Sequence, residues 1–260
     1  MLSFVDTHSH LYSKKFQDDQ EAVIERCREA GVERVYLPNI DAASVEPMLE
    51  LRERDPKRFR VMLGLHPCYV KKGFEKDLYR IEDWMKNTDF VAVGEIGLDL
   101  YWDKTLIDYQ KEAFRVQMQW AKERHLPIAI HSREANREAI DMVREEKSDD
   151  LWGVFHCFSG TVAEAQEMTE LGFYLGIGGV ATFKNGGLDK VLPDIPLAHL
   201  VLETDSPYLA PKPYRGKRNE SSYIPLIAER LAEIKGVSIE EVAQQTTANA
   251  NRLFHPVPEE

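Results

Sequence analysis

The sequence has few cysteines and no long hydrophobic segment. Its 260 residues include three cysteines, Cys27, Cys68 and Cys157, and this scattered arrangement does not suit a disulfide framework. Scattered thiols are typical of a reducing compartment, so we expect a cytoplasmic protein. The amino terminus lacks the basic start and apolar core of a signal peptide. No apolar run is long enough to span a bilayer, so no attachment to a membrane is expected.

Positive charge is also scarce. The 33 lysine and arginine residues are outnumbered by 44 acidic residues, which leaves a formal charge of −11. This charge argues against nonspecific attraction of the whole surface to nucleic acid or anionic lipid, so any contact with phosphate has to be local. A hydrophobic content of 43% is sufficient for a substantial core. We expect one domain over residues 1–260 and no obligate protein partner.

Eight short apolar segments alternate with amphipathic ones along the chain. They end roughly 25 to 35 residues apart, which is the length of one strand-helix-strand unit. Eight such units predict an α/β fold, a (β/α)8 barrel of the TIM type. A doubly wound open sheet uses the same alternation, but it would spread the strand ends along an edge. The expected strands are Leu2–Val5, Val32–Leu37, Arg60–Leu65, Phe90–Val93, Ile128–Ile130, Gly153–Phe155, Phe173–Ile177 and Leu200–Leu202.

Helical periodicity is clearest in three of the intervening segments. One covers Gln20–Ala30, and another covers Leu106–Arg124, where apolar residues recur at helical spacing. The expected buried stripe of this second helix consists of Tyr109, Ala113, Val116 and Trp120. A terminal helix is predicted over Ser238–Phe254, followed by a frayed tail over residues 255–260.

The first polar motif lies directly after the first predicted strand. His8 and His10 alternate along an extended segment, so both side chains can face one ion, with Asp6 behind them to orient the rings. Taken alone, a polar strand end with two incidental histidines explains this motif equally well. The other polar residues at strand ends favour the metal site.

Glu95 follows the fourth predicted strand. An unpaired carboxylate at such a buried position is expensive, so Glu95 needs a cation or a dense set of hydrogen bonds. Its two oxygens can bridge two metal ions, which a neutral imidazole cannot do. A salt bridge to an arginine that is near only in space is the alternative.

Two further strands end in a histidine that precedes a small residue, at His131 and His156. Their equivalent positions favour metal binding over separate structural roles. Cys157, the neighbour of His156, is expected to face the opposite side of its strand. Asp205 ends the eighth strand and is expected to bind an ion and act as the general base, while Glu203 lies deeper and gives support.

Five residues near the same strand ends are expected to contact substrate. His66 ends the third strand and is assigned to substrate or to a supporting contact rather than to metal. Basic side chains can guide phosphate, although a solvated surface loop explains those after the eighth strand equally well. An aromatic ring can stack on an unpaired base, although packing against loops is an equal explanation. The predicted substrate-binding residues are His66, Arg133, Tyr208, Arg215 and Lys217.

Together these segments resemble the TatD-type deoxyribonuclease family, within the wider amidohydrolase-like superfamily of metal-dependent hydrolases. The resemblance covers nearly the whole chain. It implies a barrel with a pair of divalent ions, Mg²⁺, Mn²⁺ or Zn²⁺, and hydrolysis of DNA phosphodiesters, extending to 3'-5' exonuclease action on single strands. The matching motifs are Asp6–His10, Gly64–Pro67, Gly94–Asp99, Pro127–His131, His156–Gly160 and Glu203–Tyr208.

Energetics favour two ions over one. Phosphodiester hydrolysis requires removal of about 20 kcal/mol from its barrier. Lowering the pKa of a bound water from ~15.7 towards ~7, to give a metal-bound hydroxide, supplies roughly 12 kcal/mol at most. A second ion that polarises the phosphoryl oxygen can supply more. We expect the first ion on His8, His10, Glu95 and Asp205, and the second on Glu95, His131 and His156.

Three functions are compatible with such a site. The leading one is a nuclease that acts on DNA, with Asp205 and Glu95 as its catalytic residues. The second is hydrolysis of small esters, lactones or amides, including deacylation of aminoacyl-tRNA, at the same two-metal site. The third is a metal-binding scaffold without turnover, which an intact Asp205 disfavours.

Overall fold

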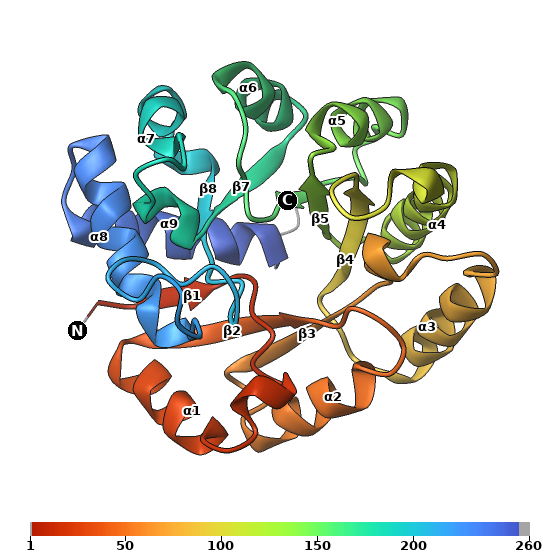
Figure 1. Ribbon diagram of the computed structural model, residues 1–260, viewed down its shortest axis with the longest axis horizontal. Coiled ribbons are helices and arrows are strands. Elements are labelled where there is room, and N and C mark those ends of the chain that lie inside the picture. Colours follow the sequence, from red (N-terminus) through yellow and green to blue (C-terminus); the bar gives the residue numbers. More distant parts are fainter. Residues whose placement is uncertain (1, 255–260) are drawn as a thin grey trace, which may run out of the picture.

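Eight parallel strands form a nearly closed barrel with helices outside them (Figure 1). The computed structural model describes residues 2–254. Neighbouring strands pair in sequence order from β1 to β8, so the predicted barrel topology is confirmed. The strands are β1 (Phe4–Asp6), β2 (Val32–Pro38), β3 (Phe59–Leu63), β4 (Ala92–Asp99), β5 (Ile128–Arg133), β6 (Gly153–Phe155), β7 (Phe173–Ile177) and β8 (Leu200–Leu202).

The barrel closes through the segments that follow β1 and β8. The Thr7 amide donates to the Leu202 carbonyl over 3.0 Å, and the Asp205 amide donates to the His8 carbonyl over 2.9 Å. These bonds place the first and last polar motifs of the chain beside each other. Residues that are almost 200 positions apart in the sequence therefore share one end of the barrel.

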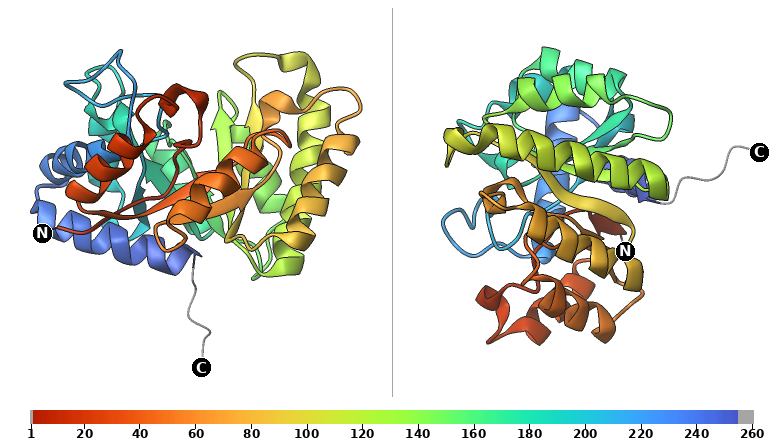
Figure 2. Two further views of the ribbon diagram at one scale, coloured as in Figure 1. Left: turned by 90° about the horizontal axis from the view of Figure 1, so that it is seen from below. Right: turned by 90° about the vertical axis from the view of Figure 1, so that its right-hand side faces the viewer.

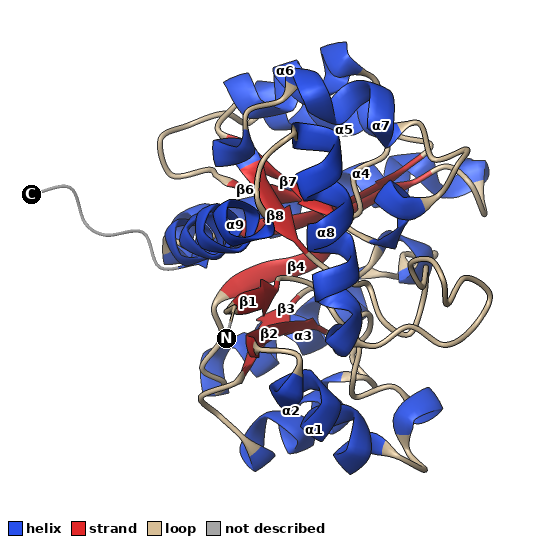
Figure 3. Ribbon diagram, turned by 90° about the vertical axis from the view of Figure 1, so that its left-hand side faces the viewer, coloured by secondary structure: helices blue, strands red, loops and turns tan. Residues whose placement is uncertain are grey.

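Helices surround the strands on the outside (Figure 3). Their buried faces are apolar, as in α1, where Val23, Ile24 and Cys27 face the core. The helices are α1 (Gln20–Glu29), α2 (Val45–Arg54), α3 (Glu75–Asn87), α4 (Ile107–Arg124), α5 (Asn136–Glu145), α6 (Val162–Glu170), α7 (Leu188–Val191), α8 (Ile224–Lys235) and α9 (Ile239–Phe254).

The terminal helix α9 lies across one end of the barrel (Figure 2, left). Its Phe254 stacks on Tyr36 of β2 with ring centroids 3.7 Å apart, and Leu253 belongs to the same buried cluster as Val5 and Val201. This packing covers the amino-terminal ends of the strands and leaves the carboxyl ends as the mouth. The predicted tail lies outside the described residues.

None of the described helices is long and apolar enough to cross a membrane.

Two strands run further than their apolar segments indicate. β4 continues from Val93 through Glu95 to Asp99, and β5 continues through His131 to Arg133, so the predicted ends at Val93 and Ile130 were wrong. A register shift between Val93 and Ile96 allows the β4–β5 ladder to continue. Glu95 and His131 therefore lie on strands rather than after them. The bounds of two other strands differ slightly from the predicted ones. β1 begins at Phe4 rather than at Leu2, and β3 ends at Leu63 rather than at Leu65.

The buried face of α4 also differs from the predicted stripe. Tyr109 and Val116 are 38% and 37% exposed, because two glutamines occupy the inner face instead. Gln110 pairs through its amide with the backbone of Asp99, over 2.8 and 3.1 Å. Gln117 pairs in the same way with the backbone of Leu65, over 2.6 and 3.2 Å. These amide pairs satisfy buried backbone groups at the ends of β3 and β4, and apolar periodicity does not reveal them.

Candidate metal centre

All six predicted ligands meet at the carboxyl ends of the strands. They come from five segments: after β1, within β4, within β5, after β6 and after β8. Beside them opens a cavity of about 920 Å³. Within the described residues, several groups of three have ligand atoms within 4.8 Å of one another, which is close enough to share an ion. The six residues are His8, His10, Glu95, His131, His156 and Asp205.

Glu95 lies at the centre of this cluster, and its two oxygens face different histidines. Oε2 lies 3.2 Å from His8 Nε2 and 3.6 Å from His10 Nε2. Oε1 lies 2.9 Å from His131 Nδ1 and 3.2 Å from His156 Nε2. Oε2 therefore faces His8 and His10, whereas Oε1 faces His131 and His156 and also His66, 3.3 Å away. One close group, His8 with His156 and Asp205, combines residues of both predicted sets.

Asp205 belongs to the set around Oε2. Its Oδ1 lies 3.5 Å from His10 Nε2, and the residue also groups with His8 and His156. Burial alone would raise the pKa of Asp205, but the neighbouring imidazoles of His10, His156 and His8 lower it below the usual value. The carboxylate is therefore ionised at neutral pH.

For His10 and His156, hydrogen bonds determine which ring nitrogen faces Glu95. The Tyr12 hydroxyl donates to the Pro38 carbonyl over 2.7 Å, so it accepts from His10 Nδ1, 2.9 Å away. His156 Nδ1 donates to Glu203 Oε1 over 3.1 Å. In both neutral rings the proton is on Nδ1, which leaves a lone pair on Nε2 for a cation.

Asp99 orients His131 in the opposite sense. Its Oδ2 accepts from His131 Nε2 over 2.8 Å, which leaves Nδ1 to face Glu95. Its Oδ1 accepts from the Tyr101 and Trp102 amides over 3.0 and 3.1 Å. Sequence reasoning did not assign this role to Asp99. The signal was present, because Asp99 follows Glu95 by four residues and so shares its face of the strand.

His66 also reaches Glu95, but as a donor. Its Nδ1 accepts from the Cys68 amide over 3.1 Å, so the proton of the neutral ring is on Nε2. That nitrogen lies 3.3 Å from Glu95 Oε1 and donates to it. His66 also forms a close group with Glu95 and His131 that could hold an ion, so its placement beside the ligands rather than among them stays a prediction.

Electrostatics in the cluster favour cations. Burial alone would raise the pKa of Glu95, yet His66, His156 and His8 hold it well below its usual range. Burial alone would lower the pKa of His156, yet Glu203 and Glu95 raise it well above its usual value. Imidazole lone pairs that face a carboxylate need a proton or a metal ion between them, and here they lie around both oxygens of Glu95.

The distances agree with shared ions. Two ligand atoms that each lie about 2.1 Å from one ion are roughly 3.0 to 3.4 Å apart, for octahedral and tetrahedral angles. The separations of Glu95 from His8, His131 and His156 run from 2.9 to 3.2 Å. The residues present therefore fit two adjoining cations with mixed nitrogen and oxygen ligands. Their roles as ligands stay predictions.

Two expectations about neighbouring residues were wrong. Asp6 does not orient the histidine rings: its carboxylate accepts from the Thr204 amide and hydroxyl over 2.9 and 2.6 Å, and so ties β1 to the segment after β8. Burial raises the pKa of Asp6 to about 7. Cys157 does not face away, but lines the same cavity as His156. It follows the end of β6 with a φ of 49°, so strand alternation does not apply to it.

The five predicted substrate-binding residues all line this cavity. Two of them are guanidinium groups stacked on aromatic rings. Arg133 lies 3.7 Å from the centroid of the Tyr101 ring, and Arg215 lies 4.4 Å from that of Phe183. Tyr208 is 48% exposed beside them. Stacking restrains each arginine while its outer N–H groups stay available for a phosphate.

Comparison with known proteins decides the family. The model of the family described as TatD related DNase matches residues 5–255 of the chain. The chain belongs to this family. One relative, the uncharacterized metal-dependent hydrolase YabD of Bacillus subtilis, is 42% identical over 250 residues, covering 96% of this chain and 98% of the relative. The 3'-5' ssDNA/RNA exonuclease TatD of Erwinia tasmaniensis is 32% identical over 256 residues, covering 96% and 99%.

A solved TatD structure has the same fold. The crystal structure of YjjV, a TatD homologue from Escherichia coli, superposes with a TM-score of 0.91 at 31% identity and covers 98% of both chains. These similarities establish the chain as a metal-dependent hydrolase of the TatD family. The barrel and the family resemblance that the sequence predicts are therefore confirmed.

Proposed function

We propose that this TatD-family hydrolase cleaves phosphodiester bonds of single-stranded DNA with two divalent ions bridged by Glu95. The observation that carries the proposal is the division of ligands by the two Glu95 oxygens. His8, His10 and Asp205 would hold the first ion together with Glu95. His131 and His156 would hold the second, also with Glu95. The mixture of imidazole and carboxylate suits Zn²⁺ and Mn²⁺, and phosphate as a further ligand suits Mg²⁺.

The chain's own groups divide the work of hydrolysis. When bound, the two ions supply positive charge that makes water more acidic and offsets negative charge on the phosphate. Asp205 is ionised and 15% exposed in its side chain, so it can accept the proton that the attacking water loses. Glu203, Asp99 and Tyr12 keep the ligand rings in fixed orientations.

The arginine-on-ring pairs support a nucleic acid as substrate. Arg133 at the end of β5 and Arg215 in the loop after β8 line the same cavity. Each can therefore hold a phosphate of a chain that crosses the mouth. A small ester offers no such series of phosphates. The relative from Erwinia tasmaniensis, named as a single-stranded DNA and RNA exonuclease, supports the same substrate class. DNA is thus the proposed partner, in local contact with the mouth.

A direct assay tests the proposal. Purified protein is incubated with end-labelled single-stranded DNA and with a panel of esters and aminoacyl-tRNA, each with Mg²⁺, Mn²⁺ or chelator. We expect metal-dependent shortening of the DNA, with release of mononucleotides from the 3' end. Processing of esters or aminoacyl-tRNA alone would replace the nuclease proposal.

Charge reversal tests the phosphate contacts separately. Arg215→Glu with Lys217→Glu removes two basic groups from the mouth, so DNA binding should weaken and the slope of log affinity against log salt should fall by about 0.7 per lost contact. Lys57→Glu is the control, because Lys57 is exposed near the start of β3, at the opposite end of the barrel. Equal slopes for the double variant and the control would exclude the contacts.

A further inference from the structure

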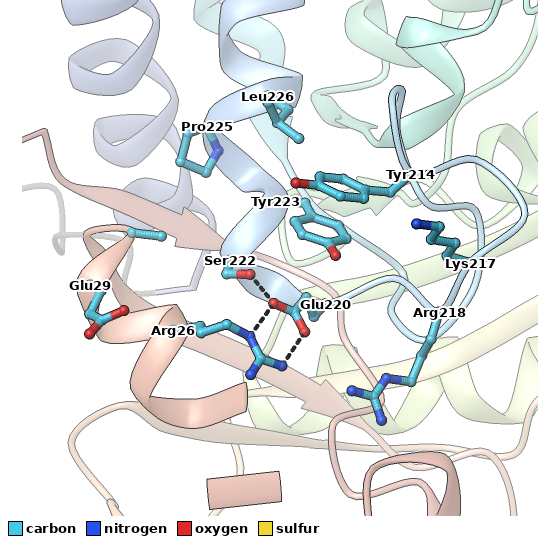
Figure 4. A pocket seen from close by; sticks show the side chains of 11 residues that line it. Arg26, Glu29, Tyr214, Lys217, Arg218, Glu220, Ser222, Tyr223, Pro225 and Leu226 are labelled. Atoms are coloured by element: carbon cyan, nitrogen blue, oxygen red, sulfur yellow. Dashed lines mark hydrogen bonds and ion pairs between the residues drawn. The ribbon is translucent and has the colours of Figure 1, made fainter. Parts of the chain in front are cut away.

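A second concavity, the side groove, lies on the outer wall of the barrel. It has a volume of about 830 Å³ and is bounded by α1, the start of α8 and the loop over residues 214–218 (Figure 4). Lys217 lines both this groove and the cavity that contains the metal ligands. The groove therefore adjoins the mouth at this one side chain, and its lining includes none of the predicted metal ligands.

Two tyrosines form one wall of the side groove. The rings of Tyr214 and Tyr223 stack with centroids 4.3 Å apart and planes inclined by 6° (Figure 4). Both residues are partly exposed, and no hydrogen bond of either hydroxyl occurs within residues 2–254. A partly exposed pair of aromatic rings whose hydroxyls have no such bond is a surface on which an unpaired base can pack.

Positive charge borders this wall. The loop from Lys212 to Arg218 contains four basic residues and no acidic one, in a chain with a formal charge of −11. Arg218 is held by Asp19, with two N–O distances of 2.7 Å. Arg218 is thereby neutralised, which leaves Lys212, Arg215 and Lys217 of this loop as the cations available to a phosphate beside the aromatic wall.

Ion pairing also fixes the floor of the groove. Arg26 donates to the two oxygens of Glu220 over 2.7 and 2.6 Å (Figure 4). This pair joins α1 to the segment before α8, so the groove keeps its shape without a ligand. A preformed surface loses less conformational entropy when a strand binds.

We propose that the side groove is a second binding subsite, which holds the part of a single-stranded nucleic acid that extends beyond the cleaved bond. A base of that strand packs on the Tyr214–Tyr223 pair, and the backbone passes Lys217 on its way from the mouth. This inference rests on the proposed nuclease function. It adds that long strands bind more tightly than short ones through contacts away from the metal ligands.

A protein occupant is disfavoured by the lining. Five of the residues that line the groove are charged, and three are apolar without an aromatic ring. The charged residues are Arg26, Glu29, Lys217, Arg218 and Glu220, and the apolar ones are Ala30, Pro225 and Leu226. The cores of protein interfaces are depleted of charged residues. A second copy of this chain would also bring like charges of the basic loop close together across the contact.

Cleavage kinetics on strands of two lengths test the subsite. The substrates are a three-nucleotide and a fifteen-nucleotide oligothymidylate, and the variant is Tyr214→Ala with Tyr223→Ala. We expect KM for the long strand to rise at least about fivefold, since stacking is lost, while kcat and the KM for the short strand stay unchanged. Tyr214→Phe with Tyr223→Phe keeps both rings and should behave as wild type. Tyr79→Ala, 66% exposed on α3, is the matched control.

The outcomes separate this inference from the proposed function. Wild-type protein that cleaves neither strand would remove the nuclease proposal and the subsite with it. Cleavage of both strands with an unchanged long-strand KM in the alanine variant would overturn the subsite alone. An equal rise for both strands, or a change in oligomeric state on sedimentation, would also overturn it, because a structural defect or a protein contact would then explain the groove.

Discussion

Three of the imidazoles that face Glu95, those of His10, His131 and His156, have a neighbour that decides which nitrogen can bind a cation, whereas Nδ1 of His8 is buried without a partner among the described residues. Glu203 holds Nδ1 of His156, whereas Asp99 holds Nε2 of His131, so the two rings turn opposite atoms towards Glu95 Oε1. Carboxylate partners of this kind raise the basicity of a ligand and restrict its rotation. The affinity for metal therefore depends on residues that touch no ion.

Asp99 provides the first test of this dependence. Asp99→Asn keeps an oxygen for the Tyr101 and Trp102 amides but can turn an N–H group towards His131, so His131 Nε2 loses its acceptor. We expect the affinity for the second ion, the one assigned to Glu95, His131 and His156, to fall about 10- to 100-fold. Calorimetric titration with Mn²⁺ measures this affinity. Asp103→Asn, at an exposed turn nearby, is the control. An unchanged binding isotherm for Asp99→Asn would refute the orienting role.

Cys68 shows how strongly this environment opposes a further negative charge. Burial and the neighbouring Asp99 raise the pKa of the Cys68 thiol to about 12. The thiol therefore stays protonated below that pH, and only the thiolate reacts with iodoacetamide. Labelling at Cys68, followed by mass spectrometry, should accelerate about tenfold per pH unit up to pH 10 without levelling off. A plateau near pH 9, as for a free thiol, would contradict this.

At the scale of elements, the pairing of β4 with β5 positions two of the predicted ligands, Glu95 and His131. The strands approach so closely that a side chain at Gly97 would place its Cβ 2.1 Å from the His131 carbonyl oxygen. Gly97 also has a φ of +132°, which disfavours other residues. This close pairing sets the distance between Glu95 and His131.

Gly97→Ala tests that contact. The clash forces the strands apart. We therefore expect the free energy of unfolding to fall by about 1 to 3 kcal/mol more than in a variant whose new alanine strains the backbone but meets no neighbouring atom. Gly73→Ala is that reference, because Gly73 also has a positive φ, of 84°, and no atom lies within 4 Å of its added Cβ. Urea denaturation compares the two variants. Equal losses of stability would show that the β4–β5 approach is not tight.

The sequence predicts the elements well where apolar periodicity governs them. β6, β7 and β8 have their predicted bounds, since each is a short apolar run. The extension of β4 was missed, because polar and glycine residues follow its apolar part and only pairing with β5 keeps them extended. The burial of Gln110 and Gln117 was missed for a similar reason, since their partners are backbone groups of distant strands.

The candidate site was predictable in its residue types but less so in its contacts. Strand-end positions identify His131 and His156, because any barrel brings such positions together. The same reasoning failed for Cys157, since its φ of 49° breaks the alternation of a strand. Asp6 points at Thr204 rather than at an imidazole, and only the closure of β1 against β8 explains why.

At the scale of the whole molecule, closure of the barrel concentrates negative charge where metal is expected. Glu95, Asp99 and Asp205 lie at one mouth of a chain with a formal charge of −11. Such a mouth repels a phosphate backbone until cations neutralise it. In the proposed site, bound cations would therefore serve both the reaction and the approach of substrate. At the opposite end of the barrel, α9 packs over the strand ends.

The most direct test of the central claim is the metal content of Glu95→Ala. In the proposed site both ions share this carboxylate, so Glu95→Ala protein that is equilibrated with Mn²⁺, desalted and analysed for metal by mass spectrometry should lose occupancy at both positions. Wild-type protein treated in parallel should retain two ions per chain, and circular dichroism should show that the variant remains folded. Retention of two ions by folded Glu95→Ala protein would contradict the account.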